Sequence, residues 1–599
     1  MSSSVGRNSL IMASGTAASR VTGQIRTILL AWALGTTGYA ANAYQAGSMI
    51  PQVIYTLVSG GIFNAVLVPQ IVRTLKSKDA ETKLNKLITL AITLLLGVTL
   101  LMAVATPLLT KLYVNGSAET MALATSFTLW CMPQIFFYGL YTVIGQILAA
   151  KDHFVTYAWS SVGANIISCI GFGAFIAMFG RATERPLGFW TPTKIALTAG
   201  TWTLGVAFQA LVLFIPLTRI GLKYRPKFGV HGIGLRSMGP VAAWSLGIVG
   251  VDQIVNIIVT RVATSAPFKA SEQLHMSQLD VAGNASYQNA YTIYMLPYSL
   301  IAVSIATAIF PKISKAIADR NIDEARKDLS SALRNLNLIM CFFAAAFIVL
   351  PWRLLRNTLA ISLANLIFAF PAPIILALLP SISVREALLI SAPLAALGIG
   401  LPLSSSYLVI QRTFYAFEDG KHPFIFMAIT MAIQGGVIIA STFILPPTQW
   451  ITVIGLAISV SFILPYPLLT HMLRSRFDGD ADDKRIITAY AKALVATIAA
   501  CVIGLLCRNG VYRLVGAHIG PDDGTMNWGQ AVLSAILLTI VIAIVYLACL
   551  WALRAEELTS VVGMLATRIP GLGNKPKSGG TASPNGKLEQ STAENGDQE

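Results

Sequence analysis

Long apolar runs, separated by short polar segments, recur along the whole chain. A run of about 18 or more apolar residues is typical of a transmembrane helix, because backbone polar groups in lipid must bond within their own segment. The pattern therefore predicts an all-α polytopic membrane protein with about fourteen transmembrane helices. The predicted spans lie near residues 10–33, 41–72, 86–112, 122–149, 154–180, 194–218, 238–261, 284–311, 335–379, 387–411, 424–445, 450–472, 487–507 and 529–553.

The run at 335–379 is longer than one span requires. It is interrupted by Pro351, Trp352, Arg353 and Arg356. Tryptophan beside arginine is typical of a membrane interface. One or three crossings in this run would keep the basic loop at 474–485 on the cytoplasmic side, where basic loops are expected. We expect one crossing, with an apolar insertion near 352–370 that re-enters the membrane or lies along it.

Basic residues gather in alternate loops, which predicts the orientation of the chain. If the N-terminus is cytoplasmic, the loops that fall inside carry most lysines and arginines, and the outside loops carry few apart from 181–194. The positive-inside rule therefore favours cytoplasmic N- and C-termini. The four inside clusters lie within residues 73–86, 219–236, 312–327 and 474–485.

Composition changes this picture little, but it excludes several protein classes. Charged residues make up 12% of the 599 residues, whereas a soluble domain carries roughly a quarter. The net charge of +16 comes from the inside loops, so it does not indicate nucleic-acid binding. The six cysteines lie in or beside apolar runs without metal-ligand spacing, so we expect neither disulfides nor a metal site. No enzyme motif is present, and we expect no cofactor.

An internal repeat is visible in the second and eighth predicted spans. Stretches starting at Ala40 and Ala290 share an Ala-Tyr pair, then a proline, an apolar run, a second proline and a basic exit. In the predicted topology both copies run in the same direction. Parallel repeats build two-lobed transporters with a site between the lobes. The alternative is two unrelated helices kinked by proline.

Two arginines, Arg20 and Arg26, lie inside the first predicted span. An arginine at mid-membrane costs about 2.5–3.5 kcal/mol on insertion scales, so it needs a water-filled cavity or an anionic ligand. The guanidinium fork suits phosphate oxygens. Six residues place the two about 240° apart on an ideal helix, so a bend at Gly23 or long side chains would be needed to aim both at one cavity. The alternative is snorkelling to the interface, which suits Arg26 better than Arg20.

Polar residues also lie inside the seventh predicted span. Asp252, Gln253 and Asn256 are spaced to share one side of a helix. The carboxylate of Asp252 would pair with an arginine of the first half or bind a coupling monovalent cation, and a purely structural ion pair is the alternative. Arg261 lies near the outer end, where it would act as a substrate ligand or as an interfacial residue.

The second predicted span carries three amides, Asn42, Gln45 and Gln52. Amides inside a helix bundle line a polar path or hydrogen-bond neighbouring helices. Both interpretations remain open for these residues.

Three stretches carry a family resemblance. The opening RNSLIMASGTAASRVTGQIRTILLAWALG, with its SRVxGxxR pattern, resembles the MurJ (MviN) family of lipid II flippases, within the wider group of multidrug and polysaccharide exporters. AANAYQAGSMIPQVIYTLVSGGIFNAVLVPQIVR and YMLPYSLIAVSIATAIFPKISKA fit the same family. The resemblance covers about residues 7–555.

The resemblance implies two six-helix lobes around a basic cavity, and two additional helices beside a hydrophobic groove. On this chain the lobes would be 1–220 and 221–478, the additional helices 479–555, and a disordered cytoplasmic tail 556–599. The substrate would be lipid II, an undecaprenyl-diphosphate-linked peptidoglycan precursor. Alternating access would move it from the inner to the outer leaflet of a bacterial cytoplasmic membrane.

The family's two important first-helix arginines correspond to Arg20 and Arg26. The chain departs from many relatives at Asn42, where they have an acidic residue, at Tyr55, where they have a basic one, and at Thr292, where they have an arginine. Its cavity is expected to be less basic than theirs.

Three other functions remain open. One alternative is an exporter of another lipid-linked oligosaccharide. Another is a cation-coupled multidrug exporter, although the arginines would repel cationic drugs. A third alternative is a membrane scaffold that recruits cell-wall synthesis proteins through its tail. Membrane lipids are partners in every case.

Overall fold

The computed structural model describes residues 2–59, 74, 80–151, 153–220, 222, 224–229, 239–348, 372–517 and 525–558. In these ranges twelve helical segments are long and apolar enough to cross a membrane. Together with α1 (Ser2–Leu34) and α2 (Gly38–Val58) they overlap all fourteen predicted spans. This confirms the all-α polytopic membrane protein that the apolar runs predict.

The described helices from α1 to α11 pack mainly with one another, and we call them the N-terminal group. α1 packs on α8, α8 on α10, α2 on α6 and α4 on α7. Their buried core includes Tyr44, Phe127, Phe172 and Phe175. After α2 the group consists of α4 (Ala80–Val104), α5 (Thr106–Tyr113), α6 (Ala118–Cys131), α7 (Gln134–Ala149), α8 (Val155–Phe179), η2 (Leu187–Phe189), α9 (Pro192–Ile195), η3 (Ala196–Gly200), α10 (Thr201–Leu211) and α11 (Phe214–Arg219).

The helices from α12 to α21 form a second bundle, the C-terminal group. Its central helix is α18, which packs on α13, α14, α15 and α20, while α12 packs on α19. The group consists of α12 (Gly239–Leu274), η4 (Gln278–Asp280), α13 (Asn284–Pro297), η5 (Tyr298–Ala302), α14 (Val303–Ala318), α15 (Ile322–Phe347), α17 (Ala372–Leu378), α18 (Val384–Ala416), α19 (Lys421–Ile444), η7 (Pro447–Gln449), α20 (Trp450–Ile463) and α21 (Tyr466–Arg474).

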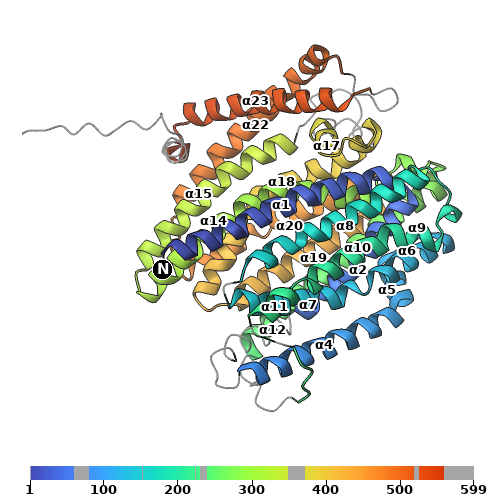
Figure 1. Cartoon of the computed structure of the whole chain (residues 1–599). Coiled ribbons are helices and arrows are strands. Elements are labelled where there is room, and N and C mark those ends of the chain that lie inside the picture. The colour runs from blue at the N-terminus through green and yellow to red at the C-terminus, as the bar shows by residue number, and fades with distance from the viewer. Residues whose placement is uncertain are drawn as a thin grey trace, which may run out of the picture.

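Two long helices, α22 (Asp483–Val515) and α23 (Trp528–Ala552), correspond to the two predicted additional spans. They pack on each other, and they contact the C-terminal group through α15 and α17. In Figure 1 they lie at the top of the molecule, on the side opposite α4. Small residues such as Ala493, Ala496 and Ala500 allow α22 to approach its neighbours closely.

Proline shapes the second copy of the predicted repeat. Pro297 ends α13, and one π-helical turn, η5, follows before α14 continues with Pro311 inside it. A proline lacks the N–H that would continue the ladder, and a π turn is one way to accommodate the loss. In the first copy Pro51 lies inside α2, but Pro69 lies outside the described residues. The repeat therefore stays a prediction.

Several other predictions also remain predictions. The apolar insertion near 352–370 and the tail beyond residue 558 lie outside the described residues. The boundary at 220/221 and the orientation of the termini are likewise not established by the packing of the helices.

Candidate functional site

The two helix groups are joined by hydrogen bonds at one end of the molecule, which we call the sealed end. This end carries the α1–α2 connection, the segment after α8, and the α12–α13 connection. α2 packs there on α12 and α13, and α5 packs on α12. Among the described residues, the hydrogen bonds between the groups lie between mid-helix and this end.

A buried carboxylate, Glu386 at the start of α18, is the centre of the sealed end. Its Oε2 lies 3.2 Å from the Arg181 Nη2, and its Oε1 accepts hydrogen bonds from the Thr36 backbone N–H (3.1 Å) and hydroxyl (3.3 Å). Ser383 and Glu386 also form the capping box that begins α18. One side chain thus starts a helix of one group and holds two segments of the other.

Asn42 forms a second connection at this end. Its Oδ1 accepts the Ala285 N–H at 2.8 Å, and its Nδ2 donates to the Gly38 carbonyl at 2.7 Å. The amide therefore satisfies a free N–H in the first turn of α13. Gly283 leaves room for it, because a Cβ there would lie 2.5 Å from the Asn42 Oδ1. This geometry favours the interpretation of Asn42 as a helix–helix connector.

The two arginines of α1 point toward different neighbours. Arg20 is exposed and reaches across to the C-terminal group, where its Nη1 donates to the Ser299 Oγ at 3.2 Å. Arg26 faces its own group and lies over the Trp202 ring, 4.6 Å from the centroid. The separation of about 240° between the two positions accounts for this divergence. The structure does not bring the two guanidinium groups to one point.

The three polar residues on α12 form a chain of hydrogen bonds. Gln253 Nε2 donates to Asp252 Oδ2 at 3.0 Å, and Asn256 Nδ2 donates to Gln253 Oε1 at 3.3 Å. Gln253 is buried, while Asp252 is exposed. Within the described ranges Asp252 forms no ion pair. Its carboxylate therefore remains open to a cation.

Asp252 and Asn256 line a cavity of about 410 Å³, which we call the tyrosine cavity. Most of its wall comes from the C-terminal group, and Met49 of α2 contributes from the other group. None of the described lining residues is a lysine or an arginine. The remaining polar or aromatic lining residues are Tyr287, Gln288, Tyr291, Tyr294, Tyr298, Ser404, Tyr407, Gln411, Gln434 and Phe462.

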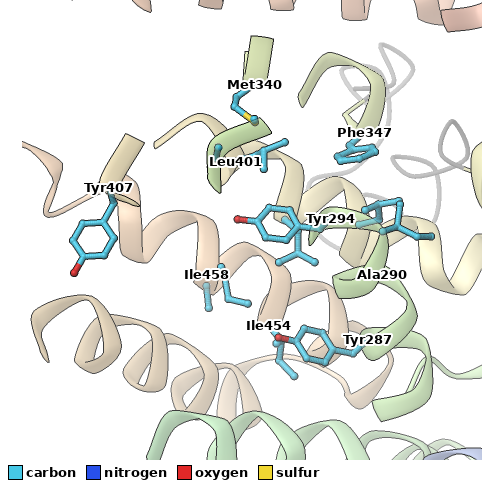
Figure 2. Close-up of a cluster of buried hydrophobic side chains, with 14 of the residues drawn as sticks. Tyr287, Ala290, Tyr294, Met340, Phe347, Leu401, Tyr407, Ile454 and Ile458 are labelled. Carbon is cyan, nitrogen blue, oxygen red and sulfur yellow. The ribbon is translucent and has the colours of Figure 1, made fainter. Parts of the chain in front are cut away.

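Four of these tyrosines occur along α13 and η5 at intervals of four, three and four residues, which is the spacing of one helix face. In Figure 2 the hydroxyls of Tyr287 and Tyr294 point to the same side, and Tyr407 of α18 lies on that side. The Tyr294 hydroxyl is 2.7 Å from the Ser404 Oγ. Aromatic faces beside a single carboxylate make a surface that attracts cations.

The other predicted site residues lie apart from this cavity. Arg261 Nη1 donates to the carbonyls of Lys111 (2.7 Å) and Leu112 (3.3 Å), so it caps the C-terminal end of α5. This position favours a structural role. Gln52 is exposed and Gln45 is half-buried on α2, and neither lines the tyrosine cavity.

Sequence reasoning missed two features for which a signal exists. The tyrosine spacing was readable as one face of a helix. The Ser383–Glu386 capping box is a recognisable pattern, and the unusual basic segment at 181–194 contains the arginine that pairs with it. The contact of Trp202 with Arg26 had no signal in the sequence, because it depends on how α1 packs within its group.

Comparisons with known sequences agree on one family. The family model described as "Lipid II flippase MurJ" matches residues 30–517. A probable lipid II flippase MurJ of Buchnera aphidicola is 26% identical over 59% of this chain and 63% of its own length, so this chain spans less than two thirds of that relative. The lipid II flippase MurJ of Burkholderia cenocepacia is 25% identical over 69% of this chain and 74% of its own.

Solved structures share the fold. A lipid II flippase MurJ in an inward closed conformation superposes with a TM-score of 0.62 at 20% identity, over 90% of this chain and 99% of that one. A multidrug resistance MATE family transporter of the MOP superfamily gives 0.57 at 17% identity, over 78% and 98%. The family match covers most of the membrane helices described above. The chain therefore belongs to the lipid II flippase MurJ family.

Proposed function

We propose that this chain is a transporter that flips lipid II from the inner to the outer leaflet of a bacterial cytoplasmic membrane. The observation that carries the proposal is the family match over residues 30–517. The fold adds support, because two helix groups held together at one end are suited to alternating access.

Arg20 is the residue best placed to bind the anionic headgroup. It lies at the boundary between the groups and uses one hydrogen bond to Ser299, so most of the five donors of its guanidinium remain for a ligand. A diphosphate offers the oxygen pairs that this fork binds best. Arg26 would contribute its positive charge without binding the headgroup directly, since its guanidinium already lies over Trp202.

Asp252 would bind a monovalent cation that couples to transport. Its carboxylate lies in the tyrosine cavity without a basic partner among the described residues, and Gln253 orients one of its oxygens. A cation there would change the charge beside α13, which also contacts α2 of the other group. Binding could thereby alter the balance between conformations.

A second candidate, export of organic cations, is favoured by the same cavity. Tyrosine faces, methionines and one acid bind lipophilic cations better than they bind a diphosphate. The two functions predict different effects at Arg20, whereas Asp252 would matter to both. Loss of Arg20 would impair lipid II flipping and spare drug export, and loss of Asp252 would abolish drug export.

The orientation and the partners of the tail belong to the same proposal. Cytoplasmic termini would place the sealed end on the outer side, so the state described here would open inward.

Recruitment of cell-wall synthesis proteins by the tail is separable from transport. A chain truncated after residue 558 should still flip lipid II, whereas a scaffold should fail.

The test uses a bacterium depleted of its own lipid II flippase. The parent chain, Arg20→Ala and the matched control Arg320→Ala, an exposed arginine after α14, are expressed at equal levels. Lipid II exposed on the outer leaflet is then measured. Restoration by the parent and the control, but not by Arg20→Ala, supports the proposal. Restoration by all three removes Arg20 from the mechanism, and failure of a correctly inserted parent overturns the substrate assignment.

A further inference from the structure

A second pocket, which shares no lining residue with the tyrosine cavity, lies where α15, α22 and the segment after α23 meet. Its volume is about 340 Å³. Arg334 contributes from α15, Lys484, Arg485 and Lys492 from the first turns of α22, and Glu556 and Glu557 from the chain after α23. We call it the α22 basic pocket.

The charges of this pocket do not cancel. Arg334 is neutralised by Glu557, whose Oε1 lies 2.7 Å from the Arg334 Nη1. Lys492 Nζ donates to the Arg554 carbonyl at 3.0 Å, which fixes the ammonium group but leaves it two further hydrogens. Lys484 and Arg485 are exposed beside it. Arg485 is paired with Asp482, 4.0 Å between Nε and Oδ1, so Lys484 and Lys492 face one further acid, Glu556, and the pocket keeps an excess of positive charge.

The face of α22 that carries these cations becomes apolar further along the helix. Lys484 and Thr488 are followed at intervals of seven, seven and four residues by Val495, Val502 and Leu506, so they share one side of the helix. These apolar side chains are 50%, 49% and 73% exposed. From Val495 to Leu506 the helix rises about 17 Å, close to the thickness of one hydrocarbon leaflet.

A tryptophan marks the level of the membrane interface beside the pocket. Trp551, in the last turn of α23, is 77% exposed. It lies three residues before Arg554, whose carbonyl binds Lys492. Exposed tryptophans of membrane proteins favour the headgroup level. The basic pocket therefore lies at headgroup depth, and the apolar face of α22 extends into the hydrocarbon.

We propose that the α22 basic pocket binds the phosphate headgroup of an anionic glycerophospholipid, with an acyl chain lying along the exposed face from Val495 to Leu506. Cations at one end and an apolar face of leaflet length at the other match the two parts of such a lipid. Basic pockets between transmembrane helices bind anionic headgroups on this principle. The assignment is independent of which molecule the chain transports.

Binding can be measured by native mass spectrometry of the full chain in detergent. The probes are dioleoyl-phosphatidylglycerol and dioleoyl-phosphatidylcholine, which have the same chains but headgroups of different charge. The test variant is the triple Lys484→Gln, Arg485→Gln, Lys492→Gln. The control removes three exposed cations of α14 and its C-terminal end, Lys312→Gln, Lys315→Gln and Arg320→Gln, so both variants lose the same charge. Equal thermal stability of both variants is established first.

We expect the parent and the control to prefer phosphatidylglycerol, and the test triple to bind it at least about tenfold more weakly. Equal weakening in both triples would show diffuse attraction and overturn the site. Equal binding of the two lipids would overturn the headgroup assignment. Inorganic phosphate that competes as well as the lipid would reassign the pocket to free phosphate. As a second variant, Val502→Asp should weaken lipid binding with the cations intact, and an unchanged affinity would overturn the acyl-chain part.

Discussion

Arg181 and Glu386 form an ion pair, 3.2 Å between Nη2 and Oε2, that joins the segment after α8 to the start of α18. Glu386 is 6% exposed, and its other carboxylate oxygen holds Thr36 in the α1–α2 connection. Two segments of the N-terminal group therefore depend on one carboxylate of the C-terminal group. The sealed end cannot open without breaking these bonds.

The first prediction is that Arg181→Gln and Glu386→Gln shift the molecule toward a state open at this end. Hydrogen bonds to charged groups contribute about 1.5–3 kcal/mol, and partial exposure of Arg181 reduces this to about 1–2 kcal/mol. The population of the open state should rise about 5- to 30-fold. Spin labels at the exposed positions Glu184 and Gln273, on opposite sides of the seal, should report longer distances.

Arg385→Gln is the matched control for this experiment. Arg385 and Asp280 also form an ion pair near the sealed end, at 2.8 Å, but both residues belong to the C-terminal group. Losing that pair should leave the distance distribution as it is in the parent. If Arg385→Gln opened the molecule as much as Arg181→Gln, general loss of charge, and not the connection between the groups, would be the cause.

The second prediction concerns Asn42, the helix–helix connector at the sealed end. Asn42→Asp keeps an acceptor for the Ala285 N–H, but it places a carboxylate oxygen where the amide Nδ2 now donates to the Gly38 carbonyl at 2.7 Å. Two acceptors then face each other, so thermal stability in detergent should fall. Gly283→Ala should lower the thermal stability as well, because the added Cβ would lie 2.5 Å from the Asn42 Oδ1. Gly436→Ala, with open space around its Cβ, is the control.

The membrane helices were predictable because lipid imposes one requirement on every span. A backbone without water must bond internally, so apolar length predicts a helix whatever it packs against. The predicted run at 122–149 illustrates the limit of this argument. It consists of two helices, α6 and α7, with a short break at Met132 and Pro133. Apolar length reveals the crossing but not the interruption within it.

The roles of the polar residues were less predictable, because they depend on partners hundreds of residues away. The cost of burying an arginine singles out Arg20 and Arg26, but the sequence does not say that Ser299 and Trp202 receive them. Arg261 was open to two interpretations, and only the packing of α12 on α5 brings it to the end of that helix. Polarity thus reveals that a residue needs a partner, and tertiary packing decides which one.

The third prediction is a pH dependence at Asp419, in the connection between α18 and α19 outside the membrane. Burial acts to raise the pKa of Asp419. Hydrogen bonds from His422 and Arg476 act in the opposite direction and more strongly, so the pKa of Asp419 lies below its ordinary value. A depressed folded-state pKa stabilises the protein above the ordinary pKa, and the gain is lost as pH falls through the folded-state value.

Asp419→Asn should therefore unfold at a lower temperature than the parent at pH 7, and the difference should shrink below about pH 4. Thermal unfolding in detergent between pH 7 and pH 3 measures it. Asp323→Asn is the comparison, since Asp323 forms an exposed pair with Arg326 and should change the curve little. A difference between Asp419→Asn and the parent that persists unchanged at low pH would assign the loss to shape and not to charge.

The fourth prediction concerns the carboxylate of the tyrosine cavity. Asp252→Asn retains the size of the side chain and an acceptor for Gln253 Nε2, but it removes the negative charge. If a monovalent cation couples there, flipping by the variant should lose its dependence on the cation gradient. Lipid II exposure in proteoliposomes with and without such a gradient measures this. Asp319→Asn, an exposed acid after α14, should retain the parent's dependence, and a parent without any dependence would contradict the coupling.

The last prediction separates the charge of Arg20 from its shape. An inside-negative potential acts on a charge that moves through the membrane, at about 2.3 kcal/mol per charge per 100 mV, so it would draw a positive empty cavity back toward the cytoplasm. Arg20→Lys keeps the charge but loses the fork that binds two phosphate oxygens. It should flip lipid II more slowly while retaining the parent's dependence on the potential. Arg20→Gln should flip lipid II more slowly and should also lose the parent's dependence on the potential. Flipping assays in proteoliposomes with an imposed potassium potential distinguish the two effects. A parent rate that is unchanged when the potential is collapsed would mean that this arginine acts by binding alone.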